Sequence, residues 1–322
     1  MIVRADAACL HGLETKTPPT ELLINFCPTG LVRRERTPHV PLSPAQIVDH
    51  SCRALELGAS IVHLHARGSD GLPEWRARAY EPMILGIRSH YPSAVIGVSC
   101  IGNDFPELER RSEVLELSGE ARPDVASLAL ATFNLPDGAN PNAPDVVVAL
   151  VEKMARHGIR PELECFDFGM INALHLLIRR GLLSPPFHGE PAARSRYTVP
   201  ATARHLSALV EDLPPQSIWA AAGIGLFQAP MNLLALAMGG HCRVGLEDNL
   251  YLDFDRRQLA TNTELVTRVV KLADAAGRPL ASHARARELL GLQPRAPHPT
   301  AAGRTTLRRE AIGVAGVHGT GA

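Results

Sequence analysis

The sequence is short of the features that mark whole classes of protein. Its 322 residues carry 33 basic and 33 acidic side chains, so a zero formal charge gives no reason to expect nucleic acid or a membrane surface as partner. No apolar run approaches the roughly 18 to 20 residues that span a bilayer. The first twenty residues are polar and contain two adjacent prolines, which is not typical of a signal peptide. We therefore expect a soluble globular protein.

Two kinds of short motif are also missing. The 6 cysteines include no CxxC pair, which argues against a Cys-based zinc site or a disulfide framework. Cys27, Cys100, Cys165 and Cys242 lie within or at the ends of apolar runs, so we expect reduced, buried thiols and a cytoplasmic protein. Neither GxGxxG nor GxxxxGK[ST] occurs, which disfavours a nucleotide-binding open sheet.

The sequence does contain a regular alternation of β-rich runs and helical patterns. The predicted strands are LLINFC (22–27), SIVHLHA (60–66), AVIGVSC (94–100), DVASLAL (124–130), PELECFD (161–167), SIWAAAGI (217–224) and CRVGLE (242–247), with a weak eighth near 184–198. Their spacing of about 30 residues is that of a βα unit. Eight such units predict a (β/α)8 TIM barrel, with a doubly wound open sheet as the alternative.

The helical patterns and the two ends complete this organisation. Before one helix, Ser43 is placed as N-cap and Pro44 at the first position, and Gly58 marks its end. Similar patterns begin near residues 145, 170, 202 and 230. Both ends are rich in Pro, Ala, Thr and Arg without sustained periodicity. We therefore expect an N-terminal extension (1–20), a catalytic barrel (21–292) and a C-terminal tail (293–322).

The strongest local signal is HLH within SIVHLHAR. Residues two apart on a strand point to the same face, so His63 and His65 should project together at the carboxyl end of their strand. Barrel enzymes place their active sites at that end. Imidazole pairs suit zinc, which binds nitrogen at about 2.0–2.1 Å. Two histidines hydrogen-bonded inside a polar barrel layer are the alternative, and we favour the metal.

A catalytic zinc needs a third protein ligand and an open position. GLEDN (245–249) closes the last predicted strand, which lies beside the first strand in a closed barrel. Glu247 can therefore reach the barrel axis, and Asp248 can act there as a base or orienting group. Capping of the following segment by the same two residues is the alternative.

Other polar residues lie at the ends of the predicted strands. They are Thr29, Ser99, Ser127, Glu162, Glu164, Asp167 and Arg243. Each alone is more often a buried hydrogen-bonding residue than a catalyst, but together they point to one polar site. The fifth predicted strand has no histidine, which disfavours the metal-dependent amidohydrolases, whereas a pyruvate-type metal aldolase stays open.

With these residues in view, the chain resembles the beta-keto acid cleavage enzyme family from about residue 22 to residue 292. The segments that carry the resemblance are INFCPTG and TPHVPLSPAQI within 24–47, GASIVHLHARGSDG (58–71), PELECFDFGMI (161–171), WAAAGIG (219–225) and GGHCRVGLEDNLY (239–251). VHLHAR combined with GGHxRVGLEDN is the specific part of this pattern.

The resemblance implies a Zn²⁺-dependent barrel that exchanges acyl groups. A β-keto acid and acetyl-CoA would give acetoacetate and a new acyl-CoA. His63, His65 and Glu247 would hold the zinc, Ser99 and Ser127 would bind the β-keto acid, and Arg243 and Asp248 would form the polar pair at the reacting centre, with Asp248 as base and Ser99 and Arg243 assisting. A homo-oligomer, with a tetramer as the expected state, is also implied.

The chain departs from the family pattern in two places. Val32 stands where some members carry a glutamate, which disfavours a substrate with a positively charged amine. The segment 187–202 (FHGEPAARSRYTVPAT) lacks the usual glycine-rich loop, and its charged residues disfavour a buried strand. Two alternatives therefore stay open. One is a CoA-independent metal-dependent aldolase or hydrolase acting on a keto acid, and the other is a metal-binding barrel with attenuated catalysis.

Overall fold

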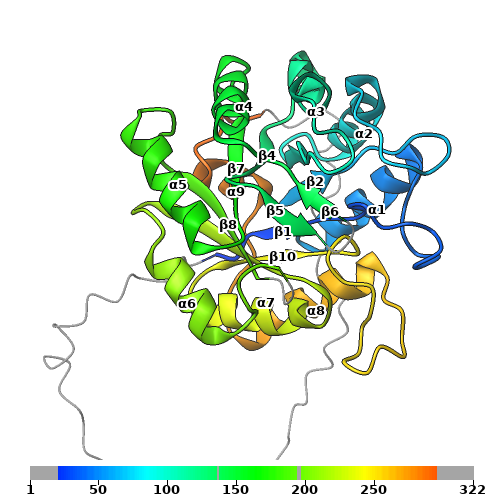
Figure 1. The fold of residues 1–322 in the computed structure, drawn as a ribbon. Helices are drawn as coiled ribbons and strands as arrows, with labels where there is room; N and C mark the ends of the chain where they lie inside the picture. The colour runs from blue at the N-terminus through cyan, green and yellow to red at the C-terminus, as the bar shows by residue number, and fades with distance from the viewer. Residues whose placement is uncertain (1–20, 136–137, 194–196, 296–322) are drawn as a thin grey trace, which may run out of the picture.

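The computed structural model describes residues 21–135, 138–193 and 197–295. Eight parallel strands within these ranges form a closed barrel, ringed by helices (Figure 1). In order round the barrel they are β1 (Ile24–Phe26), β10 (His241–Val244), β9 (Ser217–Gly223), β8 (Phe187–Ala193), β7 (Arg160–Cys165), β4 (Val125–Ala129), β3 (Val95–Val98) and β2 (Ile61–Leu64). The predicted (β/α)8 fold is confirmed. The predicted extension 1–20 and nearly all of the predicted tail lie outside the described residues.

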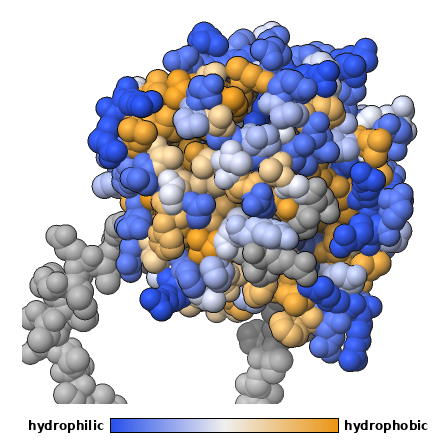
Figure 2. Space-filling view, in the orientation of Figure 1, coloured by the Kyte–Doolittle hydropathy of each residue, from blue (hydrophilic) through white to orange (hydrophobic). Residues whose placement is uncertain are grey.

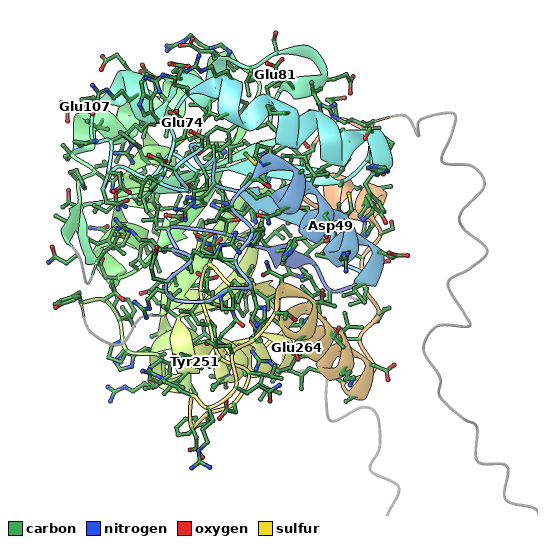
Figure 3. The ribbon with its side chains drawn as sticks, turned by 90° about the vertical axis from the view of Figure 1, so that its right-hand side faces the viewer. Asp49, Glu74, Glu81, Glu107, Tyr251 and Glu264 are labelled. Carbon is green, nitrogen blue, oxygen red and sulfur yellow. The ribbon has the colours of Figure 1, made fainter. Side chains whose placement is uncertain are left out.

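Each barrel strand is followed by a helix, as the fold class requires. The helices are α1 (Pro44–Leu57), α2 (Ala77–His90), α3 (Leu108–Arg111), α4 (Pro144–Arg156), α5 (Phe168–Arg179), α6 (Ala203–Glu211), α7 (Gln228–Ala237), α8 (Asn262–Ala275) and α9 (His283–Leu289). A two-stranded antiparallel ribbon of β5 (Phe133–Leu135) and β6 (Gly138–Asn140) follows β4. The first and last helices of the ring, α1 and α8, lie side by side and close it (Figure 3, labels Asp49 and Glu264).

The start of α1 is built as the sequence predicts. Ser43 Oγ accepts a hydrogen bond from the Gln46 backbone N–H at 3.3 Å, and the Gln46 side chain accepts one from the Ser43 N–H at 3.2 Å. This reciprocal pair, with Pro44 at the first position, satisfies donors that a helix leaves unpaired. Gly58 ends the helix with φ of 120°, a conformation that favours glycine. Helix α2 was not predicted from the sequence, because Pro82 interrupts its helical pattern.

The strand residues divide into two faces with period two. One face packs outward against the helices in the main core, and its members include Ile24, Phe26, Val62, Leu64, Ile96 and Val98. The other face points into the barrel. Its members nearest the amino ends of the strands are Leu23, Ile61, Val95 and Val125, which pack on Ala286 of α9 and on Leu290 directly after it as a second apolar cluster. An apolar plug therefore closes the amino end, and the inward polar residues lie above it.

Two strands differ from their predicted form. The segment 187–202 supplies an ordinary barrel strand, β8, which pairs with β7 and β9. Glu190 is only 2% exposed there because the barrel interior offers Arg243 as its partner, so the expectation that its charge disfavours burial was wrong. Arg194 and Arg196 lie outside the described residues. Strand β10 ends at Val244 rather than at Glu247, because Gly245 turns the chain with φ of 150°.

The molecular surface agrees with this layered arrangement. Figure 2 shows polar residues round the edge of the face seen in Figure 1, while apolar residues gather toward its centre.

Among the described residues, no helix combines the length and apolarity needed to cross a bilayer. Cys27, Cys100, Cys165 and Cys242 are buried and free, as expected.

Candidate metal centre

His63 and His65 lie together at the carboxyl end of β2, as predicted. Their side chains are 1% and 6% exposed, and the two Nε2 atoms face each other at 3.2 Å. The Nδ1 atom of His63 lies 2.9 Å from the Glu162 carboxylate, which places a proton on Nδ1, so that the neutral ring has its lone pair on Nε2. That lone pair is directed at His65, where a cation can accept it.

Glu247 completes this group from the turn after β10. Its Oε1 lies 3.3 Å from His65 Nε2. Ligand atoms of His63, His65 and Glu247 all lie within 4.8 Å of one another. Glu247 Oε2 is buried without a hydrogen-bond partner, which is costly for a carboxylate oxygen. Two facing imidazole nitrogens and an orphaned carboxylate oxygen fit a divalent cation, and imidazole and carboxylate are ligands that zinc accepts.

Glu162 stands behind His63 in the middle of β7. It is 0% exposed and accepts a hydrogen bond from Asn25 Nδ2 at 2.6 Å in addition to the His63 contact. Burial lowers the pKa of His63, but Glu162 and Glu247 outweigh burial and raise it. The reciprocal effect of His63 holds the pKa of Glu162 far below its usual range despite burial. An ionised carboxylate behind a ligating imidazole fixes its tautomer and orientation.

Arg243 joins four carboxylate contacts on the opposite side of the centre. Its Nη1 lies 3.0 Å from Glu190 Oε1, its Nη2 lies 2.5 Å from Glu247 Oε1, and its Nε lies 2.9 Å from Asp248 Oδ2. A further contact runs from Nη1 to Glu190 Oε2 at 3.2 Å. Burial alone would lower the pKa of Arg243, yet the surrounding carboxylates raise it. Arg243 therefore stays charged and fixes Glu247 and Asp248 beside each other.

Glu164 lies one inward position above Glu162 on β7, in register with Glu190 on β8. Burial and the neighbouring carboxylates raise the pKa of Glu164 to about 7, against the opposing effect of Arg243 and His63. Burial also raises the pKa of Glu190, although Arg243 opposes it. The barrel mouth thus contains carboxyl groups that differ widely in proton affinity.

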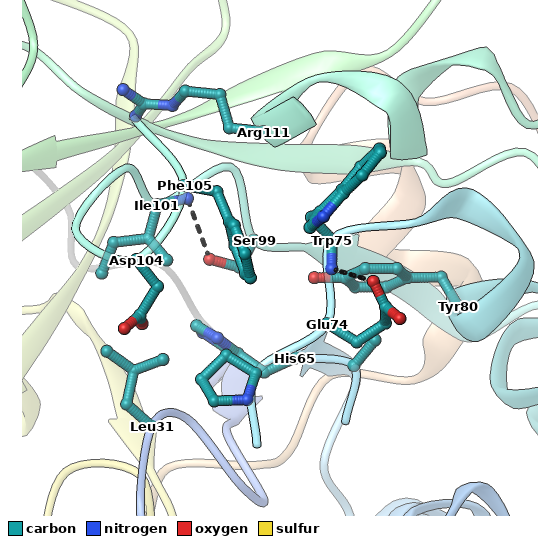
Figure 4. Close-up of a pocket in the computed structure, with 12 residues that line it drawn as sticks. Leu31, His65, Glu74, Trp75, Tyr80, Ser99, Ile101, Asp104, Phe105 and Arg111 are labelled. Carbon is teal, nitrogen blue, oxygen red and sulfur yellow. Dashed lines mark hydrogen bonds between the residues drawn. The ribbon is translucent and has the colours of Figure 1, made fainter. Parts of the chain in front are cut away.

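Ser99 borders a small cavity of about 30 Å³ next to His65 (Figure 4). Its Oγ accepts a hydrogen bond from the Ile101 N–H at 3.2 Å. The cavity is lined by Leu31, His65, Ala66, Pro73, Glu74, Trp75, Tyr80, Ser99, Ile101, Asp104, Phe105 and Arg111. Ser127 is 3% exposed and does not line this cavity; its Oγ accepts from the Cys100 N–H at 3.0 Å and so fixes the end of β3.

Two of the predicted polar residues have structural contacts away from the metal group. Thr29 donates to the Pro41 carbonyl at 3.2 Å and secures the loop after β1. Asp167 follows β7 and caps α5 by accepting from the Met170 N–H at 2.9 Å. Prediction from sequence missed Asn25, the pairing of Glu190 with Arg243, and His188, a buried residue whose Nε2 lies 3.9 Å from Glu162 Oε1. For Asn25 the period-two pattern of 22–27 contained the signal, since it places that side chain between Leu23 and Cys27 on the inner face.

The fold and the candidate metal centre together define a structural class of protein. The chain is a (β/α)8 barrel with a His-His-carboxylate group at the carboxyl ends of its strands, where such barrels carry their active sites. The family profile described as beta-keto acid cleavage enzyme matches residues 21–292. The chain belongs to the beta-keto acid cleavage enzyme family, as its motifs indicated.

Curated relatives cover most of the chain. A protein of Cupriavidus necator named 3-oxoadipate:acetyl-CoA acetyltransferase is 36% identical over 84% of this chain and 94% of its own length. The 3-keto-5-aminohexanoate cleavage enzyme of Acetoanaerobium sticklandii is 33% identical over 81% of this chain and 94% of its own. The apo structure of ObcA has a similar fold, with a TM-score of 0.72 at 22% identity; it covers 80% of this chain, which spans 66% of ObcA.

Proposed function

We propose that this protein is a zinc-dependent beta-keto acid cleavage enzyme. It would exchange acyl groups between a β-keto acid and acetyl-CoA, giving acetoacetate and a new acyl-CoA. The observation that carries the proposal is the group of His63, His65 and Glu247, whose potential ligand atoms lie within 4.8 Å of one another and in which Glu247 Oε2 is buried without a hydrogen-bond partner. Family membership and the acetyl-CoA transferase names of the relatives support the reaction.

His63, His65 and Glu247 would hold the zinc. A zinc ion supplies Lewis acidity that polarises a bound carbonyl and favours loss of a neighbouring proton. The chain's own contribution is to aim the three ligands. Glu162 orients His63 through Nδ1, and Arg243 orients Glu247 through Oε1. These contacts fix the Glu247 carboxylate, whose Oε1 lies 3.3 Å from His65 Nε2 and whose Oε2 has no hydrogen-bond partner.

Asp248 is the proposed base for the proton between the two carbonyl groups of the β-keto acid. Arg243 Nε holds its Oδ2 at 2.9 Å, next to the Glu247 ligand. The same guanidinium contacts Glu247 and Asp248, so a proton acceptor and a metal ligand keep a fixed separation. A positioned carboxylate typically contributes about 10²- to 10⁴-fold to such a proton transfer.

Ser99 and Ser127 are the proposed contacts of the β-keto acid. Ser99 Oγ borders the cavity beside His65 and can offer its hydroxyl to a substrate oxygen. Ser127 supports the same region through the Cys100 N–H. Breaking a C–C bond without water needs the thioester acceptor to lie alongside, and the loops at the barrel mouth would position it.

The remaining parts of the proposal concern the surroundings of the site. Strand β8 completes the barrel despite its unusual sequence, so the departure from the family pattern does not interrupt the barrel at 187–193. We further propose a cytoplasmic homo-oligomer, with 21–292 as the catalytic barrel and the flanking segments as extensions.

The test is a screen of β-keto acids with the zinc-loaded protein, with and without acetyl-CoA. We expect acetoacetate and the new acyl-CoA to form in equal amounts, and only when acetyl-CoA is present. Equal cleavage without acetyl-CoA would favour the CoA-independent aldolase or hydrolase. Absence of stoichiometric zinc in the wild type would remove the proposal altogether.

A substitution of Asp248 separates metal binding from proton transfer. Asp248→Asn should keep one equivalent of zinc and lose turnover by about 10²-fold or more, because the amide cannot accept the proton. Zinc content and turnover number provide the measurement. An active Asp248→Asn variant would relieve Asp248 of the base role.

A further inference from the structure

Arg67 is a buried arginine without an ion pair among the residues that the structure describes. It lies two residues beyond His65 and is only 5% exposed. Its Nη2 donates to the Gly30 carbonyl and, at 3.0 Å, to the Val32 carbonyl, and its Nη1 donates to the Gly71 carbonyl at 3.2 Å. One guanidinium thus ties the loop after β1 to the turn after β2. A lysine ammonium could not span these carbonyls at once.

One of these carbonyls belongs to a glycine that touches the metal group. Gly30 has φ of +51°, a conformation that L side chains rarely adopt. A Cβ placed on it would lie 2.8 Å from Glu247 Cβ and 2.9 Å from Glu247 Cδ. The Glu247 side chain therefore fills the space that a side chain at position 30 would need. The backbone at Gly30 forms one wall of the place where the carboxylate lies.

We propose that Arg67 is a positioning residue: its hydrogen bonds hold the Gly30 backbone beside Glu247 and so fix this carboxylate for the metal. The inference rests on the proposed metal site but assigns a role to a residue outside it. Arg243 fixes the end of Glu247 through Oε1, and Gly30 confines its stem. Together they fix the Glu247 carboxylate beside His65, whose Nε2 lies 3.3 Å from Glu247 Oε1.

The charge of Arg67 and its hydrogen bonds to the loop predict opposite effects on metal binding, so an experiment can separate them. Arg67 is a cation near Glu247. Burial lowers the pKa of Arg67, and the negative charge of Glu247 is the strongest of the effects that oppose this shift. If only charge mattered, its removal would strengthen binding of a metal cation. If its hydrogen bonds hold Gly30 in place, removal weakens that binding. Arg67→Met removes the charge and the hydrogen bonds, whereas Arg67→Lys keeps the charge alone.

Gly30→Ala tests the other half of the arrangement. The added methyl group competes with Glu247 for space in a strained backbone conformation. Gly277→Ala is the matched control, because Gly277 has φ of +65° and nothing within 4 Å of an added Cβ. Arg278→Met is the control for Arg67, because Arg278 donates to the Gly239 and Gly240 carbonyls at the amino end of β10.

The experiment measures zinc affinity by competition with a chromophoric chelator, with thermal melting of the metal-free proteins alongside. We expect Arg67→Met, Arg67→Lys and Gly30→Ala to bind zinc roughly 10- to 100-fold more weakly than the wild type. Both controls should stay within about twofold, whatever their melting temperatures. Unchanged or tighter binding by Arg67→Met, or unchanged binding by Gly30→Ala, overturns the inference while leaving the proposed function standing. A wild type that takes up no zinc overturns both.

Discussion

Two buried clusters of charge lie at opposite ends of the barrel strands and are satisfied in different ways. The amino-end cluster consists of Asp124, Arg88, Arg287 and Arg295. The carboxyl-end cluster consists of His63, His65, Glu247, Arg243, Asp248, Glu162 and Glu190. The first surrounds one carboxylate with arginines, whereas the second surrounds one arginine with carboxylates.

The carboxylate of the amino-end cluster is fully engaged. Asp124 Oδ2 accepts from Arg88 Nη2 and the Ile96 N–H, both at 3.0 Å, and Oδ1 accepts from Arg287 Nη2 at 2.9 Å. These contacts join α2, β3 and α9 at the closed end of the barrel. Both oxygens of the carboxylate have protein donors, so Asp124 needs no ligand and serves to hold elements together.

The carboxyl-end cluster leaves one carboxylate oxygen without a donor. Its carboxylates outnumber its one guanidinium, and Glu247 Oε2 is buried without a donor. Buried charge is stable only when paired. The difference teaches that burial of charge is not by itself a sign of function. Between these two clusters, the distinguishing feature is a carboxylate oxygen, Glu247 Oε2, that the protein buries without a donor.

The largest expected effect comes from removing a ligand from the carboxyl-end cluster. His65→Ala should abolish stoichiometric zinc binding, with a loss greater than the roughly 10- to 100-fold expected when only a group behind a ligand is removed. Metal analysis after dialysis provides the measurement. The control is His241→Ala, because His241 is also buried but its Nδ1 accepts the Leu23 N–H at 3.0 Å near the amino end. A full equivalent of zinc in His65→Ala would break the ligand assignment.

The amino-end cluster should respond in stability and not in metal binding. Asp124→Asn leaves Arg88 and Arg287 without their carboxylate, and breaking a buried pair typically costs about 3–5 kcal/mol. Urea denaturation of the metal-free protein measures this loss, and zinc affinity should stay at the wild-type value. A weakened zinc affinity would mean that the two clusters are coupled through the barrel.

The pH dependence of stability sharpens the same comparison. Burial would raise the pKa of Asp124, but its hydrogen bond from Arg287 and the nearby guanidinium charges lower the pKa below 3.8. The folded state thus holds this proton less tightly than the unfolded chain. The stabilisation from Asp124 is complete above the unfolded pKa of about 4 and is lost as pH falls through the folded value. The stability gap between wild type and Asp124→Asn should therefore shrink below pH of about 4.

The barrel and the pairing of His63 with His65 could be predicted because local patterns carry them. Strand runs at βα spacing indicate the fold, and two histidines on one strand face indicate a candidate ligand pair. The partners Glu190 and His188 could not be predicted, because their roles depend on strands distant in sequence that meet only in the closed barrel. Glu190 shows the limit most clearly. Its charge disfavours a buried strand until Arg243, 53 residues away, is placed beside it.

The smallest of the expected effects concerns the group behind the ligands. Glu162→Gln removes the negative charge from His63 Nδ1 and places an amide N–H₂ near the Asn25 donor. We expect zinc binding to weaken about 10- to 100-fold, or about 1.4–2.7 kcal/mol. Competition with a chelator measures this change.

The matched control for Glu162→Gln is Glu190→Gln, because both carboxylates are buried in the same interior and both face Asn25 Nδ2. Glu190 has Arg243 as its main partner and touches neither imidazole. If orientation of His63 is the cause, Glu162→Gln weakens zinc binding much more than Glu190→Gln does. Equal losses would mean that the cluster attracts the cation through its summed charge, and that the hydrogen bond to His63 has no special part in it.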